Sequence, residues 1–393
     1  MDEGQDRTTE IKYLKGFAIL AILLGHTSIG VTHVSGVNGV VLTNVILETF
    51  SQFALPLFVI VLGFLLSVRT DELISQHKNI SKRRFFIKQL GSILPIYIIF
   101  SSVYLLVQAA TSYLSGEALP TAGEVIYQLL TAGTYYHLWY FALLIQLILI
   151  YPAITVLYHR VSEIKDPINL VLGALILQIA WNTGLALCGG SVGPVTSDLA
   201  GKFLFTHIFY FMLGIYTCHH FKEIREWFRT HTVWWMLIPV TAITVILSAT
   251  WVSGLLSYGN FSDIPETWFI SAGIIIPLYY ILISGICFRS CIILSEKKGI
   301  FFSMIRKLSS CSFGIFLIHP LVMLALNRTI FPGISISYGD WIYYPLLFAS
   351  ALILSYILVQ FIRYLPHSSM IIGVEPVRNT ISLSAIILPH QKR

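Results

Sequence analysis

The stretch that decides the fold is the first apolar segment, Tyr13-Leu-Lys-Gly-Phe-Ala-Ile-Leu-Ala-Ile-Leu-Leu-Gly-His26. It predicts a membrane-spanning helix with a cation, Lys15, at one membrane edge and the imidazole of His26 near mid-depth. Eleven helical residues separate the two groups by about 16.5 Å along the axis. Such a pair could hold an anionic donor at the surface while a base works deeper. Ionisable groups inside a membrane are costly, which makes both residues functional candidates.

Composition places the whole chain in the membrane class. Of 393 residues, 56% are hydrophobic and 11% are charged, and the mean hydropathy is +0.77. Apolar stretches of about 20 residues, the length that crosses a bilayer as a helix, recur from end to end. We therefore predict an all-α, polytopic transmembrane helical bundle of about ten spans. The predicted spans are 13–33, 46–68, 91–114, 138–158, 167–187, 203–221, 233–254, 268–288, 311–330 and 342–364.

The basic residues predict the orientation of this bundle. With the N-terminus in the cytoplasm, all of the 25 Lys and Arg residues except Lys202 and Arg328 fall in cytoplasmic segments. This is the positive-inside pattern, and it predicts that both termini are cytoplasmic. The net charge of +6 is then mostly topological and indicates no nucleic-acid partner. We expect a membrane-embedded domain over 1–365, a cytoplasmic or membrane-surface tail over 366–393, and a multi-pass protein of the cell (plasma) membrane.

His26 is the first candidate catalytic residue. Imidazole titrates near neutral pH and suits a general base that takes a proton from a hydroxyl group. The alternative is a packing histidine bonded to a neighbouring carbonyl. Lys15 by itself is typical of a cation that marks the cytoplasmic end of a first helix.

A basic run opens the third span. Its members are Lys82, Arg83, Arg84 and Lys88. Ammonium and guanidinium groups bind phosphates well, so the run is a candidate donor-binding site. Positive-inside anchoring explains it equally, and both roles can hold together.

Two further residues within the spans are catalytic candidates. His319 lies about mid-depth in span nine, directly before Pro320. Because this proline frees a carbonyl one turn back, His319 either satisfies that group or takes part in the chemistry. Glu48, in the outer half of span two, either orients a histidine or reaches outside water.

Aromatic and histidine residues also mark the outer side. His137 and Trp139 stand at the outer end of span four, where interface anchors are common, and either residue could touch an external acceptor. His207 in span six carries the same ambiguity. The five cysteines lack the further ligands that a zinc site needs. We therefore expect no metal and no bound cofactor, and we find no hydrolase or phosphate-loop motif.

Four stretches together carry a resemblance to a known family, acyltransferase family 3 of integral membrane proteins. The stretches are Leu14-Lys-Gly through His26, Ala54-Leu-Pro-Leu-Phe through Gly63-Phe-Leu-Leu66, Ile93-Leu-Pro-Ile-Tyr97, and His137-Leu-Trp-Tyr with Tyr151-Pro152 and Ser312-Phe-Gly-Ile-Phe-Leu-Ile-His-Pro-Leu321. The chain is most similar in style to the stand-alone polysaccharide O-acetyltransferases. It departs from the family pattern where Lys15 replaces the commoner arginine, and where Leu62 and Ser92 stand at positions often held by serine and arginine.

The resemblance implies a function and roles for the residues above. An acyl-CoA, acetyl-CoA above all, would enter from the cytoplasm as co-substrate, with its phosphates on Lys15 and the basic run. His26 would deprotonate a hydroxyl of an envelope glycan, a glycolipid or a lipid-linked sugar, with Glu48 and His319 as further catalytic candidates. His137 and Trp139 would lie on the acceptor side. Transfer could be direct or pass through an acyl intermediate on the protein.

Two other function classes stay open from sequence. An exporter of a polysaccharide intermediate would also use about ten spans, buried histidines and helices broken at Pro56 and Pro320. It would need no acyl-CoA, and its substrate would cross unmodified. A sensor or scaffold would have little reason to place His26 above Lys15.

Overall fold

Every regular element in the described part of the chain is helical. The computed structural model describes residues 3–75, 82–192, 199–259, 261, 264, 272–296 and 299–374. No β-strand occurs within these ranges. The prediction of an all-α bundle is confirmed.

Nine helical segments among the described residues are long and apolar enough to cross a membrane. They are Thr9–His33, Gly39–Asp71, Arg83–Ser115, Trp139–Ser162, Ile168–Cys188, Trp234–Tyr258, Ile275–Ser295, Ser303–Gly333 and Tyr343–Ile362. Each overlaps one of the predicted spans, although the segment Ile275–Ser295 overlaps only part of the eighth predicted span, 268–288. The orientation of the termini stays a prediction.

The elements that build these segments follow one another in chain order. The longer helices are α1 (Glu3–Ser28), α2 (Gly39–Ser51), α3 (Ala54–Ser75), α4 (Lys82–Ser115), α6 (Trp139–Ser162), α7 (Ile168–Val192), α9 (Ile208–His219), α10 (Phe221–Thr230), α11 (Leu237–Tyr258), α12 (Ala272–Ser295), α13 (Ile300–Ala325) and α15 (Tyr343–Ile362). The shorter elements are the 3₁₀ turns η1 (Ile29–His33), η2 (Leu204–Thr206) and η3 (Trp234–Met236), the helix α5 (Ala122–Leu130), the π-helical turn η6 (Leu326–Ile330), and the helices α14 (Phe331–Gly333) and α16 (Ser368–Ile372).

The sixth predicted span, 203–221, contains only a short helix. α9 has 12 residues and is about 18 Å long, less than a bilayer core requires. Two glutamines from neighbouring helices accept hydrogen bonds from backbone N–H groups in the first turns of η2 and α9. Gln178 of α7 accepts a hydrogen bond from the Phe209 N–H at 3.1 Å, and Gln146 of α6 accepts one from the Leu204 N–H at 3.0 Å. Irregular backbone at membrane depth is tolerated when protein partners replace the missing helical bonds.

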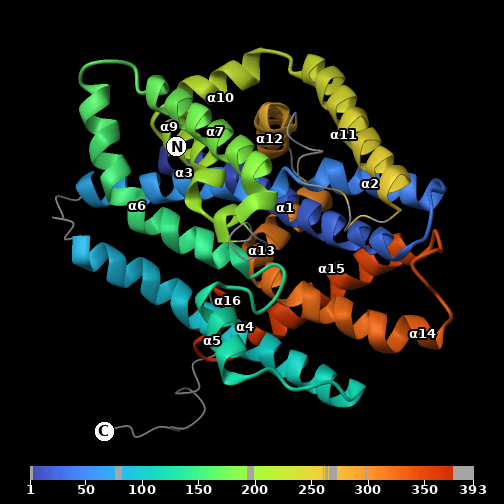
Figure 1. Ribbon diagram of the computed structural model, residues 1–393. Coiled ribbons are helices and arrows are strands. Elements are labelled where there is room, and N and C mark those ends of the chain that lie inside the picture. The colour runs from blue at the N-terminus through green and yellow to red at the C-terminus, as the bar shows by residue number, and fades with distance from the viewer. Residues whose placement is uncertain are drawn as a thin grey trace, which may run out of the picture.

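The helices that carry the candidate site run through the middle of the bundle. Figure 1 shows α1 and α13 at its centre, and α1 packs against α2, α3, α12, α13 and α15. A small residue permits the closest approach. A Cβ added to Gly16 would lie 2.7 Å from the side chain of Ile305 and 2.9 Å from its carbonyl oxygen. Only glycine lets α13 approach α1 this closely next to Lys15.

A reciprocal pair of glycines joins α3 to α9. A Cβ added to Gly63 would strike the carbonyl oxygen of Phe211, and one added to Gly214 would strike the carbonyl oxygen of Ile60. Each helix therefore lays its backbone on the other, as small residues allow in membrane bundles. Gly63 belongs to one of the family-like stretches, and the structure gives it a packing role.

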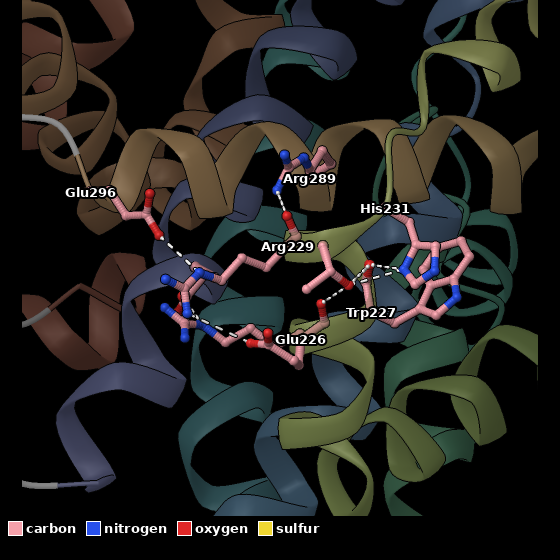
Figure 2. Close-up of polar contacts among 9 residues, drawn as sticks. Glu226, Trp227, Arg229, His231, Arg289 and Glu296 are labelled. Carbon is pink, nitrogen blue, oxygen red and sulfur yellow. Dashed lines mark hydrogen bonds and ion pairs between the residues drawn. The ribbon is translucent and has the colours of Figure 1, made fainter.

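The amphipathic helix α10 fastens the start of α1 to α12. Arg225 donates a hydrogen bond from Nε to Oε1 of the fully buried Glu10 at 2.7 Å. Figure 2 shows the contact with α12, where Arg229 approaches Glu296 at 3.8 Å and Arg289 donates to the Arg229 carbonyl at 2.9 Å. The exposed pair adds little stability, whereas the buried Glu10 carboxylate depends on its partner.

The first residues of the predicted tail form a short helix. The short helix α16 packs against α4, α13 and α15, and Ser368 and Ile372 are fully buried there. The remainder of the expected tail, 375–393, lies outside the described residues.

We predict that Gly63→Ala destabilises the bundle, because the added methyl group has no space beside the Phe211 carbonyl. Overpacking of this kind costs about 1–3 kcal/mol. The measurement is the thermal unfolding midpoint of the detergent-solubilised protein. Gly173→Ala is the matched control, since no atom lies within 4 Å of the added Cβ on α7. That variant should be neutral or slightly more stable. Equal midpoints for Gly63→Ala and the native protein would contradict the packing account.

Candidate active site

Lys15 and His26 lie on one face of α1. Eleven residues turn an α-helix through three revolutions and about 20° more, so the two side chains project in nearly the same direction. Each stands beside a glycine that admits a neighbouring helix. Gly16 admits α13, and a Cβ on Gly25 would lie 2.5 Å from the hydroxyl of Ser51 at the end of α2. Both groups therefore stand next to a close contact of α1 with a neighbouring helix.

His26 is hydrogen-bonded to His319. Its Nδ1 lies 2.7 Å from Nε2 of His319, and the ring centroids are 5.0 Å apart with 23° between the ring planes. The Nδ1 atom of His319 lies 3.0 Å from the carbonyl oxygen of Ile315, one turn back on α13. Pro320 lacks the N–H that would bond the Phe316 carbonyl four residues back, so the bond to Ile315 reaches the carbonyl next to the one predicted. A role of His319 in the chemistry stays a prediction.

This chain of bonds assigns the tautomers of both histidines. The Ile315 carbonyl can only accept, so Nδ1 of His319 carries its proton and Nε2 carries a lone pair. Nδ1 of His26 must then donate to that lone pair. The Nε2 atom of His26 is left unprotonated and free to accept a proton. An imidazole oriented in this way by a second group is the arrangement that general-base catalysis uses.

His26 lines two adjoining cavities. The first, here called the wide cleft, has a volume of 620 Å³. Its walls include His26, Thr32, His33, Glu48, Tyr135, Tyr136, Asn327, Tyr338 and Tyr343. The second, here called the inner chamber, has a volume of 170 Å³. Its walls include Ala21, Gly25, His26, Glu48, Ser51, Gln52, Ala54, Leu55, Tyr136, His137, Trp139 and Phe316.

The aromatic run before α6 covers the histidine pair. The ring of Tyr136 meets His26 edge-on at 5.0 Å between centroids, and the ring of His137 lies 5.8 Å from that of His319. His137 is 3% exposed. Burial lowers the pKa of His137 well below its usual range, and the neighbouring His26 lowers it further, so the ring is neutral. The structure therefore brings His137 to the histidine pair, with Trp139 on the chamber wall.

Glu48 lines both cavities without bonding a histidine in the described part of the chain. Its two carboxylate oxygens accept from the Gln52 amide at 2.9 and 3.0 Å. Gln52 in turn accepts from the hydroxyl of Tyr280 at 3.1 Å. The group that orients His26 is His319. Glu48 is a second polar residue on the walls of the two cavities that His26 lines.

The basic candidates lie elsewhere. Lys15 is half-buried on α1, and Arg83, Arg84 and Lys88 are exposed on the first turns of α4. The side chain of Lys82 lies outside the described residues. α4 packs chiefly on α6 and α16. Within the described ranges, these four cations have no hydrogen bond or ion pair with one another or with His26.

Sequence reasoning missed the tyrosines of the site and the polar groups of the wide cleft. Tyr135 and Tyr136 directly precede His137, and that aromatic run was an available signal. Asn327 accepts from the hydroxyl of Tyr343 at 3.0 Å. It lies in the π-helical turn η6, a feature that often occurs at functional sites. His207, also a candidate, lies outside both cavities, with its ring 5.9 Å from Trp139.

Comparison with known proteins gives one clear match. A family model described as an acyltransferase domain matches residues 8–360. That range includes α1, the aromatic run before α6 and α13, so every side chain of the histidine pair and both cavities lies inside it. No curated protein and no solved structure matches the chain significantly.

We predict that His319→Phe changes the tautomer of His26, because the ring that holds its Nδ1–H is lost. The measurement is the ¹⁵N spectrum of histidine-labelled protein in bilayers, where protonated and unprotonated ring nitrogens have separate shifts. The native protein should show His26 protonated at Nδ1 alone, assigned by its loss in His26→Gln. The same tautomer for His26 in His319→Phe would contradict the proposed orientation.

Proposed function

The chain belongs to the membrane acyltransferase family whose domain spans residues 8–360, and from this premise we propose that it O-acetylates an envelope glycan. In this proposal the donor is cytoplasmic acetyl-CoA. The acceptor is a hydroxyl of a polysaccharide, a glycolipid or a lipid-linked sugar, and the protein works in the plasma membrane. Family membership favours acyl transfer over export of an unmodified substrate.

The observation that carries the proposal is the position of His26. Its ring lines both the wide cleft and the inner chamber, and His319 holds its Nδ1 at 2.7 Å. A base at the border of two cavities can act on a hydroxyl from one and an acyl group from the other. Holding two reactants in this way removes much of the entropic barrier to their reaction.

The transfer then proceeds as a balanced exchange. Nε2 of His26 takes the proton of the acceptor hydroxyl as the oxygen attacks the acyl carbon. The new C–O bond forms, the C–S bond breaks, and the proton returns from His26 to the CoA sulfur. His319 supports the imidazolium that forms in between, because its Nε2 lone pair accepts from Nδ1 of His26 throughout.

The donor would lie along the face of α1 that bears both groups. Lys15 stands about 16.5 Å from His26 on that face, at the end predicted to be cytoplasmic. A phosphate held at Lys15 would leave the rest of the donor to extend toward the base. The exposed Arg83, Arg84 and Lys88 offer a second, more peripheral set of cations for a phosphorylated donor.

The wide cleft suits a sugar acceptor. Its walls combine the rings of Tyr136, Tyr338 and Tyr343 with the polar groups of Thr32 and Asn327. His33 packs against Tyr338 with ring centroids 4.7 Å apart. Pockets of this kind bind through aromatic surfaces and fix orientation with a few polar groups.

We predict that His26→Ala abolishes transfer of label from acetyl-CoA to non-CoA envelope material in inside-out vesicles. Loss of a general base lowers the rate about 10²–10⁴-fold. His231→Ala, at the exposed end of α10, is the matched control and should keep the native rate. Full transfer by His26→Ala would remove this residue from the chemistry. Absence of transfer by the native protein, together with no binding of acetyl-CoA, would refute the acetyltransferase.

We also predict that Lys15→Gln weakens donor binding more than it slows the chemistry. A charge-assisted hydrogen bond contributes about 1.5–3 kcal/mol, so KM for acetyl-CoA should rise at least tenfold while kcat changes little. Lys15→Arg, which keeps the charge, should restore most of the affinity. Lys12→Gln, an exposed lysine on the same helix, serves as the control. Equal KM values for the Lys15→Gln and native proteins would exclude Lys15 from donor binding.

A further inference from the structure

Resting on the proposed function, we propose that the inner chamber is the acyl subsite of the donor, that its size limits the transferred group to short chains, and that His137 holds the acyl carbonyl there. In this inference the chamber decides which acyl groups the protein can transfer. It depends on three observations: the volume of the chamber, the narrowing beyond it, and the unpartnered imidazole on its wall.

The chamber is small because small side chains let three helices converge on it. Ala21 and Gly25 come from α1, Ser51 from α2 and Ala54 from α3. At Gly25 even a methyl group would meet the Ser51 hydroxyl. A dry protein cavity of about 150 Å³ holds a molecule the size of benzene. A chamber of 170 Å³ therefore accepts an acetyl group with its sulfur and the adjoining methylene, but not a medium-length acyl chain.

Aromatic rings narrow the chamber on the side of α1 that leads to Lys15, where the arm of the donor would enter. The next cavity in that direction has a volume of only 20 Å³. It shares Ile22, Leu55 and Phe316 with the chamber. Its other walls are the rings of Phe58, Tyr140 and Phe313. That space holds about one water molecule. It must widen to admit the arm of the donor and leaves no room for a longer acyl chain beside that arm.

His137 is the polar group of the chamber that lacks a partner. Both its ring nitrogens are buried, and neither forms a hydrogen bond within the described residues. The edges of Tyr104 and Phe316 pack on the ring, each 5.1 Å away between centroids. Buried polar groups without partners are rare and call for an explanation.

A bound acyl group supplies that missing partner. A neutral imidazole has one N–H donor, and the carbonyl oxygen of a thioester is an acceptor. As the acceptor hydroxyl attacks, this oxygen gains negative charge, and the His137 N–H stabilises it. When the C–S bond breaks, the charge leaves with the sulfur and the carbonyl is restored in the ester.

The first test compares acetyl-, butyryl- and hexanoyl-CoA, each labelled in the acyl group, as donors in the same vesicles. We expect the native protein to transfer hexanoyl at least about 100-fold more slowly than acetyl, since poorly accommodated methylenes cost about tenfold or more. Leu55→Ala enlarges the chamber and should raise the hexanoyl-to-acetyl ratio about tenfold. Leu62→Ala, on the same helix but on no described cavity wall, is the matched control and should leave the ratio unchanged.

The second test addresses His137. His137→Leu should lower kcat with acetyl-CoA about 10²-fold, as loss of an oxyanion donor does, with little change in KM for acetyl-CoA. His137→Gln, whose amide also donates, should recover part of the rate, which a purely packing role would not predict.

The outcomes separate this inference from the proposed function. Equal transfer of acetyl and hexanoyl by the native protein would overturn the chamber as acyl subsite while leaving the acyltransferase intact. So would an unchanged ratio in Leu55→Ala, or a native kcat in His137→Leu. If no acyl-CoA served as donor for the native protein, both the proposed function and this inference would fall.

Discussion

The close packing of α1 on α13 is the contact on which the site depends. At one end, Gly16 has no side chain, so the carbonyl oxygen of Ile305 approaches α1 more closely than a Cβ at this position would permit. At the other end, His26 and His319 share a hydrogen bond of 2.7 Å. Inside an apolar bundle, burying an imidazole costs less free energy when the ring finds a hydrogen-bond partner. The pair and the helix contact therefore stabilise each other, and α2, α3, α12 and α15 pack around α1 to complete the enclosure.

In the proposed function, this arrangement would let one ring serve two reactants. The lone pair of His26 Nε2 follows from a chain of three groups that begins at the Ile315 carbonyl. No carboxylate is needed to set it, and Glu48 remains free to bond Gln52. A histidine oriented by a neutral histidine forms its imidazolium less readily than one paired with a carboxylate. A thioester donor is activated enough for such a base, because its sulfur leaves easily.

The sequence predicted most of the bundle because membrane helices must satisfy their own backbone and face lipid with apolar side chains. Lys15, His26 and His319 could be singled out for the same reason, since an ionisable group at depth is conspicuous. The pairing of His26 with His319 could not be predicted, because it joins residues 293 positions apart through helix packing. The short α9 escaped prediction as well. The hydrophobicity of this segment matches a full span. Gln146 and Gln178 on other helices supply hydrogen bonds to the backbone N–H groups at its start.

The fastening of α1 has a mechanical consequence. Near its start, the buried Glu10 is held by Arg225 of α10 at 2.7 Å, and near its end His26 is held by His319. A helix anchored at both ends does not slide like a piston or rotate about its axis. α4, in contrast, packs chiefly on α6 and α16 at the edge of the bundle (Figure 1). Any helix motion that would admit a bulky donor is therefore expected in the peripheral helices, while α1 keeps its position.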